Sequence, residues 1–248
     1  ELQNKRVLVV GTGISGIGAV KALQHTGAKP ILYDANDKLQ ETDIRAKFET
    51  DAEVEIVLGN LPKEMEEQVE LVILSPGVPT DTEFVNAFRD RGIKIWGEIE
   101  LAYELGKGRV VGITGTNGKT TTTSLVGEIM AAYYEHVDVV GNIGNPYTLT
   151  ALDAKEDTVT VAEISSFQLE TIENFKPDVS AILNITPDHL NRHHTMENYV
   201  AAKEAITRNQ TKEQTCVLNY ENEYTRAFGE KCPAQVVWFS SVRKLENG

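Results

Sequence analysis

Two glycine-rich segments, each placed between an apolar run and a helical pattern, constrain the fold of this chain more than any other feature. The first is Gly11–Gly16, a GxGxxG motif, and the second is GITGTNGKTT at 112–121. Glycines permit a tight turn and a close approach of the backbone to a phosphate, which then binds at the N-terminus of the following helix. Two such segments in one chain predict two phosphate-binding units in series.

Short apolar runs alternate with helical patterns along the whole chain of 248 residues. Runs such as Arg6–Val10 and Val159–Glu163 are continuously apolar, which is typical of strands buried on both faces of a parallel sheet. We therefore expect an α/β fold. It would have a Rossmann-like N-terminal domain at 1–106 and a P-loop-type central domain with a mostly parallel sheet at 107–248, divided near Gly106–Gly108.

Several helices and side-chain environments are predicted from local patterns. The longest helices are expected at Lys119–Tyr133 and Met196–Arg208, and Thr80 with Glu83 forms a capping-box pattern before a helix at Phe84–Arg91. By spacing alone, Lys203 is a surface lysine. His193 and His194 are expected to be exposed loop residues.

Charge and composition exclude some classes of protein. The net charge of −13, from 24 Lys+Arg and 37 Asp+Glu, argues against a nucleic acid or an anionic membrane surface as the main partner. No apolar run approaches the ~20 residues of a membrane-spanning helix, so membrane insertion is not expected. The two cysteines, Cys216 and Cys232, form no CxxC motif, which argues against a disulfide framework or a zinc site and favours the cytoplasm.

The second glycine-rich segment carries the stronger chemical prediction. Backbone N–H groups of Gly115–Gly118 would cradle phosphates, Lys119 would neutralise the β- and γ-phosphates, and the Thr120 hydroxyl would bind Mg²⁺. The strict P-loop spacing requires glycine at position 113, where this chain has Ile113, and Gly112 comes one residue early. The segment is therefore a variant loop that predicts a nucleoside triphosphate site.

Polar side chains follow the strands predicted after this loop. Glu163 ends one strand, His189 follows the next, and Asn142 lies in a Gly-Asn-Ile-Gly loop. Since ligands bind beyond the carboxyl ends of strands in open α/β sheets, Glu163 and His189 are expected beside the phosphates. Glu163 suits Mg²⁺, whereas His189 is left open between a metal ligand, a substrate contact and a structural role.

Three classes of function remain. With Asp34 after the second strand, Gly11–Gly16 alone predicts a dinucleotide site, as in a nicotinamide-dependent (NAD) oxidoreductase. A second phosphate site has no place in a single-domain dehydrogenase, so the pair of sites favours a transfer or ligation driven by ATP. The third class is a non-catalytic nucleotide-binding module.

The chain resembles the Mur ligases, the ATP-dependent amide-bond-forming enzymes of peptidoglycan synthesis. The segments that resemble the family's ATP-binding half are GITGTNGKTTTT at 112–123, GNIGNP at 141–146, AEISSFQLE at 162–170, ILNITPDHLNRH at 182–193 and YVAAKEAI at 199–206. VLVVGTGISG at 7–16 and LSPGVP at 74–79 resemble the family's UDP-binding domain. The resemblance covers essentially the whole chain.

The resemblance implies specific site residues. The ATP site would comprise Gly115, Thr116, Asn117, Gly118, Lys119, Thr120 and Thr121. Two Mg²⁺ ions would be held, one by Thr120 and Glu163, the other by His189 and a carbamylated Lys203, and Lys119, His189 and Lys203 would be catalytic. The UDP-linked substrate would contact Gly13, Ile14, Ser15, Asp34, Ser75, Pro76, Gly77, Asn142, Ser165, Gln168 and Arg192.

The resemblance also implies a reaction. The substrates would be ATP, UDP-N-acetylmuramoyl-L-alanine and D-glutamate, joined through an acyl phosphate with release of ADP and phosphate. The enzyme is expected to be a monomer. The family adds a third, amino-acid-binding domain that this sequence lacks, so we expect the chain by itself to be unable to complete the ligation.

Overall fold

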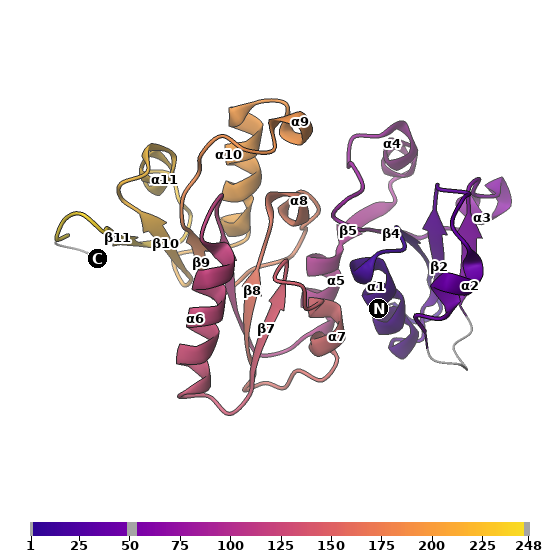
Figure 1. Cartoon of the computed structure of the whole chain (residues 1–248), viewed down its shortest axis with the longest axis horizontal. Helices are drawn as coiled ribbons and strands as arrows, with labels where there is room; N and C mark the ends of the chain where they lie inside the picture. Colours follow the sequence, from indigo (N-terminus) through magenta and orange to yellow (C-terminus); the bar gives the residue numbers. More distant parts are fainter. Residues whose placement is uncertain (1, 49–53, 246–248) are drawn as a thin grey trace.

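The computed structural model describes residues 2–48 and 54–245, which form two parallel sheets that lie side by side (Figure 1). The first sheet has the strand order β3-β2-β1-β4-β5. Its strands are β1 (Arg6–Val10), β2 (Lys29–Asp34), β3 (Glu55–Leu58), β4 (Leu71–Leu74) and β5 (Lys94–Gly97). Its helices are α1 (Ile14–His25), α2 (Glu41–Arg45), α3 (Lys63–Glu67), α4 (Glu83–Asp90) and α5 (Glu98–Leu105).

The second sheet has the strand order β11-β10-β9-β6-β8-β7. Its strands are β6 (Arg109–Thr114), β7 (Val137–Gly141), β8 (Val159–Glu163), β9 (Val179–Ile182), β10 (Thr215–Asn219) and β11 (Gln235–Phe239). Its helices are α6 (Lys119–Ala131), α7 (Tyr147–Ala151), α8 (Ser166–Leu169), α9 (Leu190–His193), α10 (Met196–Glu204) with a 3₁₀ turn at Ala205–Thr207, and α11 (Glu223–Gly229).

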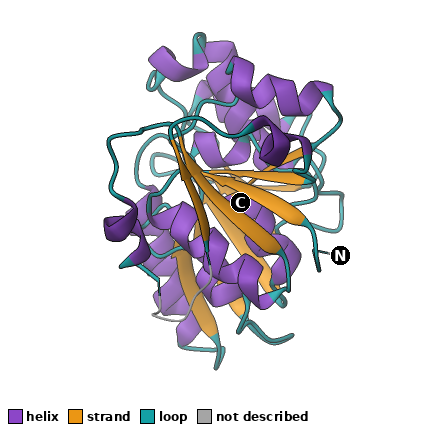
Figure 2. Ribbon diagram, turned by 90° about the vertical axis from the view of Figure 1, so that its right-hand side faces the viewer, coloured by secondary structure: helices purple, strands orange, loops and turns teal. Residues whose placement is uncertain are grey.

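Both sheets are packed on two faces, as the apolar runs predict. In β1, Val7 and Val9 join the core cluster on one face, whereas Leu8 and Val10 join the cluster on the other. Helices accordingly lie on both sides of the strands (Figure 2). The prediction of an α/β fold built from parallel sheets is confirmed.

Buried carboxylates join the two halves of the molecule. Glu100, fully buried in α5, accepts hydrogen bonds from the backbone N–H groups of residues 173–175 at 2.6–3.0 Å. Glu98, at the start of the same helix, accepts one from Thr148 N in α7 at 2.9 Å. Burial raises the pKa of both carboxyl groups. Helices α1, α5 and α7 fill the space between the sheets (Figure 1).

Some predicted elements have different bounds. The helix expected at Met196–Arg208 ends at Glu204 and tightens into the 3₁₀ turn. The cap of α4 is Thr82, whose side chain accepts from Val85 N, so the capping-box prediction for Thr80 is wrong. Within the described residues, we find no helix with the length and apolar character needed to cross a membrane.

Candidate active site

The carboxyl ends of three neighbouring strands gather the predicted residues of the second sheet. From β6 the chain passes to β7 and β8 on one side and then crosses to β9 on the other. Gly115 follows β6, Glu163 is the last residue of β8, and Asn184 comes shortly after β9. Because ligands of open α/β sheets bind at such a switch point, this edge is the candidate active site.

The loop between β6 and α6 has the backbone of an anion-binding turn. Gly115 has a φ of +149° and Gly118 one of +82°, a region that favours glycine, and Gly118 caps the helix. The bond from Thr122 N to Gly118 O begins the helical ladder, so the N–H groups of Lys119–Thr121 have no partner within α6. Those N–H groups and the helix dipole favour a bound anion.

Asn184 holds this loop in place, a role that the sequence analysis did not predict. Its side chain accepts from Asn117 N and donates to Asn117 O, both at 2.9 Å, and its carbonyl accepts from Thr116 N at 2.9 Å. The Thr116 hydroxyl also lies 3.1 Å from the Tyr199 hydroxyl. The available signal in the sequence was an amide side chain just beyond an apolar strand.

Lys203 lies buried beneath the same loop, with 2% of its surface exposed. Its Nζ donates to Gly115 O at 2.8 Å and lies 4.7 Å from the centre of the Tyr199 ring. Burial and the Lys119 ammonium lower the pKa of Lys203 to about 7. The spacing-based prediction of a surface lysine is wrong, because Tyr199 and Lys203, four residues apart, share the helix face that packs against the loop.

Lys119 is the first residue of α6, directly after this loop, and is half-buried. Its Nζ donates to Thr116 O at 3.0 Å, so two lysines bond to successive carbonyls of one loop. Thr120 and Thr121 are exposed in the first turn of α6, and Asn117 is exposed before it. The predicted ATP-binding residues therefore lie together around one turn.

Glu163 provides a carboxylate at the same edge. It is 1% exposed, and its Oε1 accepts from Asn142 Nδ2 at 2.8 Å. Its Oε2 is buried with no hydrogen-bond partner among the described residues, an expensive state that a cation would relieve. No three His, Cys, Asp or Glu side chains in residues 2–48 and 54–245 are grouped around one point. The unpartnered oxygen of Glu163 fits Mg²⁺, which binds few carboxylates and completes its shell with hydroxyl, water and phosphate oxygens.

His189 lies at the start of α9 with its side chain about half exposed. It adopts a left-handed backbone with φ of +52°, and its Nε2 lies 3.4 Å from Asp188 Oδ2. Its ring centre is 5.1 Å from that of Phe167 and 6.4 Å from that of Tyr199. His189 and Lys203 thus flank the same tyrosine.

Ser165, Gln168 and Arg192 use their side chains within the protein. Ser165 caps α8 in a capping box, in which its hydroxyl accepts from Gln168 N and its own N–H donates to Gln168 Oε1. The Arg192 guanidinium bonds to Glu170 and to the carbonyl of Val78 in the first half of the molecule. These contacts position α8 and α9.

The Asp34 side chain is hydrogen-bonded to the glycine-rich segment of the first sheet. Its Oδ2 accepts from Thr12 N at 3.2 Å and from Thr12 Oγ1 at 3.0 Å. A Cβ built on Gly16 would lie 1.9 Å from Gly11 O, so only glycine permits this approach of α1 to the loop. Ser75, at the end of the neighbouring β4, has a buried hydroxyl with no hydrogen-bond partner among the described residues.

The other residues predicted to bind the UDP-linked substrate lie at the carboxyl ends of β1 and β4. Gly13 caps α1 and is exposed, Ile14 is 71% exposed, and Ser15 is half-buried. Pro76 is half-buried and Gly77 is exposed in the turn after β4.

The first and second sheets are in contact near the carboxyl ends of their strands. A narrow cavity is lined by Ser75, Pro76 and Val78 from the first half and by Phe167 and Gln168 from α8. Predicted substrate residues from the two halves of the molecule, Ser75 and Pro76 from one and Gln168 from the other, thus line the same cavity.

Two family models match the chain. The model of the Mur ligase middle domain matches residues 113–246, more than half of the chain, and the model "Mur ligase MurD-like, N-terminal domain" matches residues 5–97. The chain belongs to the Mur ligase family.

Curated relatives and solved structures agree with this placement. The Mur ligase chain is 58% identical over 244 residues to the UDP-N-acetylmuramoylalanine–D-glutamate ligase of Lachnoclostridium phytofermentans, covering 98% of the chain and 54% of that protein. It is 46% identical over 249 residues to the protein of that name from Clostridioides difficile, covering 100% of the chain and 55% of that protein. The chain spans about half the length of the curated relatives it matches.

Two solved structures share the Mur ligase fold. The UDP-N-acetylmuramate:L-alanyl-gamma-D-glutamyl-meso-diaminopimelate ligase from Neisseria meningitides has a TM-score of 0.63 at 16% identity, covering 99% of this chain and 82% of that one. MurF ligase from Thermotoga maritima, solved in complex with ADP, has a TM-score of 0.51 at 17% identity, covering 98% of this chain and 49% of that one. At these identities the likeness concerns the fold alone.

Proposed function

We propose that this chain is the part of a Mur ligase that binds ATP and UDP-N-acetylmuramoyl-L-alanine, and that the protein joins D-glutamate to the latter. The observation that carries the proposal is the loop at 115–118. Around this loop lie the N–H groups at the start of α6, Lys119, the buried Lys203 and the Glu163 carboxylate, one oxygen of which has no partner among the described residues. Relatives that carry the name of this ligase support the choice of substrates.

The proposed reaction has two steps. The L-alanine carboxylate attacks the γ-phosphorus of ATP, which gives an acyl phosphate and ADP. The D-glutamate amine then attacks the acyl carbon, loses a proton and expels phosphate. Lys119 and the N–H groups at the start of α6 hold the phosphates in line and offset the charge that develops on the transferring group.

Mg²⁺ would be held by Glu163 together with the Thr120 hydroxyl, and a second ion by His189 and a carbamate on Lys203. When bound, these ions neutralise phosphate charge. The chain's own residues prepare the first position, because Asn142 donates to one Glu163 oxygen and orients the other.

The first sheet would bind the UDP group. The diphosphate would lie on the exposed N-terminus of α1 at Gly13, Ile14 and Ser15, and the base would lie near Asp34 and the Ser75–Gly77 turn. Membership of a ligase family favours this proposal over an NAD-dependent oxidoreductase. We further infer two domains, divided near Gly106–Gly108.

Calorimetric titration of the chain with UDP-N-acetylmuramoyl-L-alanine, ATP with Mg²⁺, and NAD⁺ tests the proposal. We expect binding of the nucleotide sugar and of ATP, and no binding of NAD⁺. Binding of NAD⁺ alone, or of none of the three by a folded chain, would contradict it.

Lys203 is expected to form a carbamate. A neutral amine adds to CO₂ and releases one proton, and the lowering of the Lys203 pKa to about 7 makes the neutral amine available at neutral pH. At fixed dissolved CO₂, raising the pH from 6 to 8 should therefore increase the carbamate. With ¹³C-labelled CO₂, NMR should reveal one carbamate signal that rises over this range. Lys203→Met should abolish it, and survival of the signal in that variant would assign it elsewhere.

A further inference from the structure

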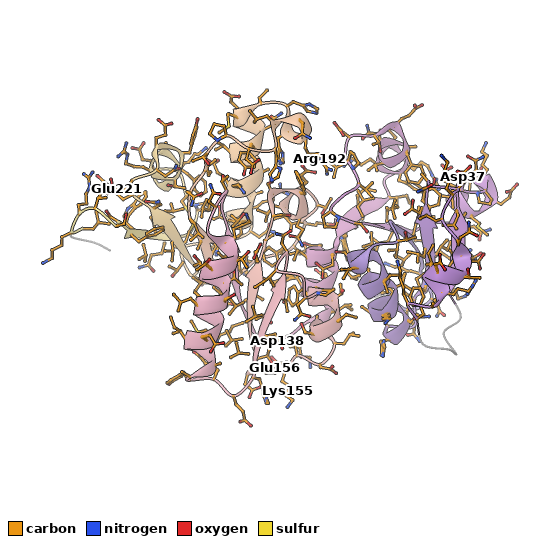
Figure 3. All side chains as sticks on the ribbon, viewed as in Figure 1. Asp37, Asp138, Lys155, Glu156, Arg192 and Glu221 are labelled. Atoms are coloured by element: carbon orange, nitrogen blue, oxygen red, sulfur yellow. The ribbon has the colours of Figure 1, made fainter. Side chains whose placement is uncertain are left out.

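A hydrogen-bonded cluster joins the two halves of the molecule beside the site. The Glu170 cluster consists of Thr80, Ser166, Glu170, Arg192 and His193. Glu170 Oε2 accepts from Arg192 Nη2 at 2.8 Å and from Thr80 Oγ1 at 3.1 Å. The same Arg192 nitrogen donates to Val78 O at 3.0 Å, and Figure 3 places Arg192 on the side of α9 that faces the first half.

The other Glu170 oxygen continues the cluster into the second half. Oε1 lies 3.5 Å from His193 Nδ1, and His193 Nε2 lies 2.9 Å from Ser166 Oγ. His193 is 5% exposed, so the prediction of an exposed loop residue is wrong, and burial lowers the pKa of its ring. In the neutral ring, Nδ1 carries the proton toward the carboxylate, and Nε2 accepts from the Ser166 hydroxyl.

Both ends of the cluster reach predicted site residues. Ser166 begins α8, three residues after Glu163. The ring of the adjacent Phe167 stacks on His193, its centre is 5.1 Å from that of His189, and the Arg192 guanidinium lies over it at 4.8 Å. At the other end, Val78 and Thr80 follow the Ser75–Gly77 turn, which the proposed function assigns to the UDP substrate. One carboxylate therefore bonds both to the segment that follows the proposed UDP turn and to α9, the helix that follows His189.

We propose that Glu170 is a positioning residue that fixes the 75–80 segment of the first half against α8 and α9, so that the muramoyl-L-alanine end of the nucleotide sugar is aligned with the phosphoryl-transfer site. The inference rests on the proposed function. Glu170 touches neither substrate. It acts through Arg192, Thr80 and His193.

The geometry separates this role from ATP binding. The loop at 115–118 is held by Asn184, Thr116 and Lys203, and none of these bonds to Glu170. Loss of the Glu170 carboxylate should therefore affect the nucleotide sugar and spare ATP.

The test compares Glu170→Gln with Glu221→Gln by calorimetry. Glu221 pairs with Arg243 at the far end of the second sheet, so its variant makes the same chemical change away from the site (Figure 3). We expect about tenfold weaker binding of UDP-N-acetylmuramoyl-L-alanine in Glu170→Gln, an ATP affinity within about twofold of wild type, and no change in Glu221→Gln.

A milder variant and a spectroscopic measurement separate the positioning role from a general loss of structure in Glu170→Gln. Thr80→Val, which retains the shape of the side chain and loses one hydrogen bond, should weaken nucleotide-sugar binding a few-fold. Long-range ¹H–¹⁵N NMR should detect His193 protonated on Nδ1 in the wild type and a changed tautomer in Glu170→Gln.

The outcomes distinguish the two proposals. If the wild type binds no nucleotide sugar, the proposed function fails. If the wild type binds it and both Glu170→Gln and Thr80→Val bind equally well, the positioning role is overturned. Equal losses of nucleotide-sugar and ATP affinity would mark Glu170 as a general structural residue and would also overturn it.

Discussion

Lys119→Met is expected to weaken ATP binding by about 10- to 100-fold, the loss typical of a charge-assisted phosphate contact. The Lys119 ammonium bonds to the loop carbonyl of Thr116, so it lies on the turn where the helix N–H groups gather. Methionine retains the length of the side chain and removes the charge. Calorimetric titration with ATP and Mg²⁺ measures the change.

Lys155→Met is the matched control. Lys155 bonds to His136. Figure 3 shows Lys155 at the end of the second sheet opposite α9, so its variant should bind ATP like the wild type. The pKa of Lys203 provides a second readout for Lys119→Met. The Lys119 charge lowers the pKa of Lys203, so that pKa should rise in Lys119→Met and carbamate formation at neutral pH should fall. Unchanged ATP affinity in Lys119→Met would remove this loop from the proposed mechanism.

The fold was predictable because strands that are buried on both faces are apolar along their whole length. β8 was predicted with both of its ends, Val159 and Glu163. For the next strand, the pattern at Val179–Asn184 predicts pairing over all six residues, whereas β9 ends at Ile182, because Asn184 turns to hold the loop at 115–118. An apolar run indicates burial, but it does not reveal where backbone pairing gives way to other contacts.

Long-range contacts explain the site residues that local patterns misjudged. Lys203 bonds to a carbonyl 88 positions earlier in the chain, and His193 bonds to a serine 27 positions earlier. Neither partner is visible in helical spacing, because spacing defines the faces of a helix and not what each face contacts. Resemblance to a family implied a site role for Lys203, whereas no motif pointed to the burial of His193.

Gly16→Ala is expected to destabilise the chain strongly, by about 3 kcal/mol. The new Cβ would overlap the carbonyl oxygen of Gly11 at 1.9 Å, and neither backbone can move freely, because α1 packs on the sheet and Gly11 N bonds to Tyr33 O at 2.8 Å. Thermal unfolding should show a fall in Tm of roughly 6–12 °C.

Gly13→Ala separates this packing effect from ligand binding. Gly13 has a φ of −74°, and no heavy atom lies within 4 Å of a Cβ built there, so unfolding should change by less than about 1 kcal/mol. The methyl group would nevertheless stand where the diphosphate is proposed to approach α1, and nucleotide-sugar affinity should fall about tenfold. If Gly13→Ala binds the nucleotide sugar like the wild type, the exposed end of α1 is not the diphosphate site. A stable Gly16→Ala would instead mean that α1 can withdraw from β1 at little cost, and the glycine at that position would then need a reason other than packing.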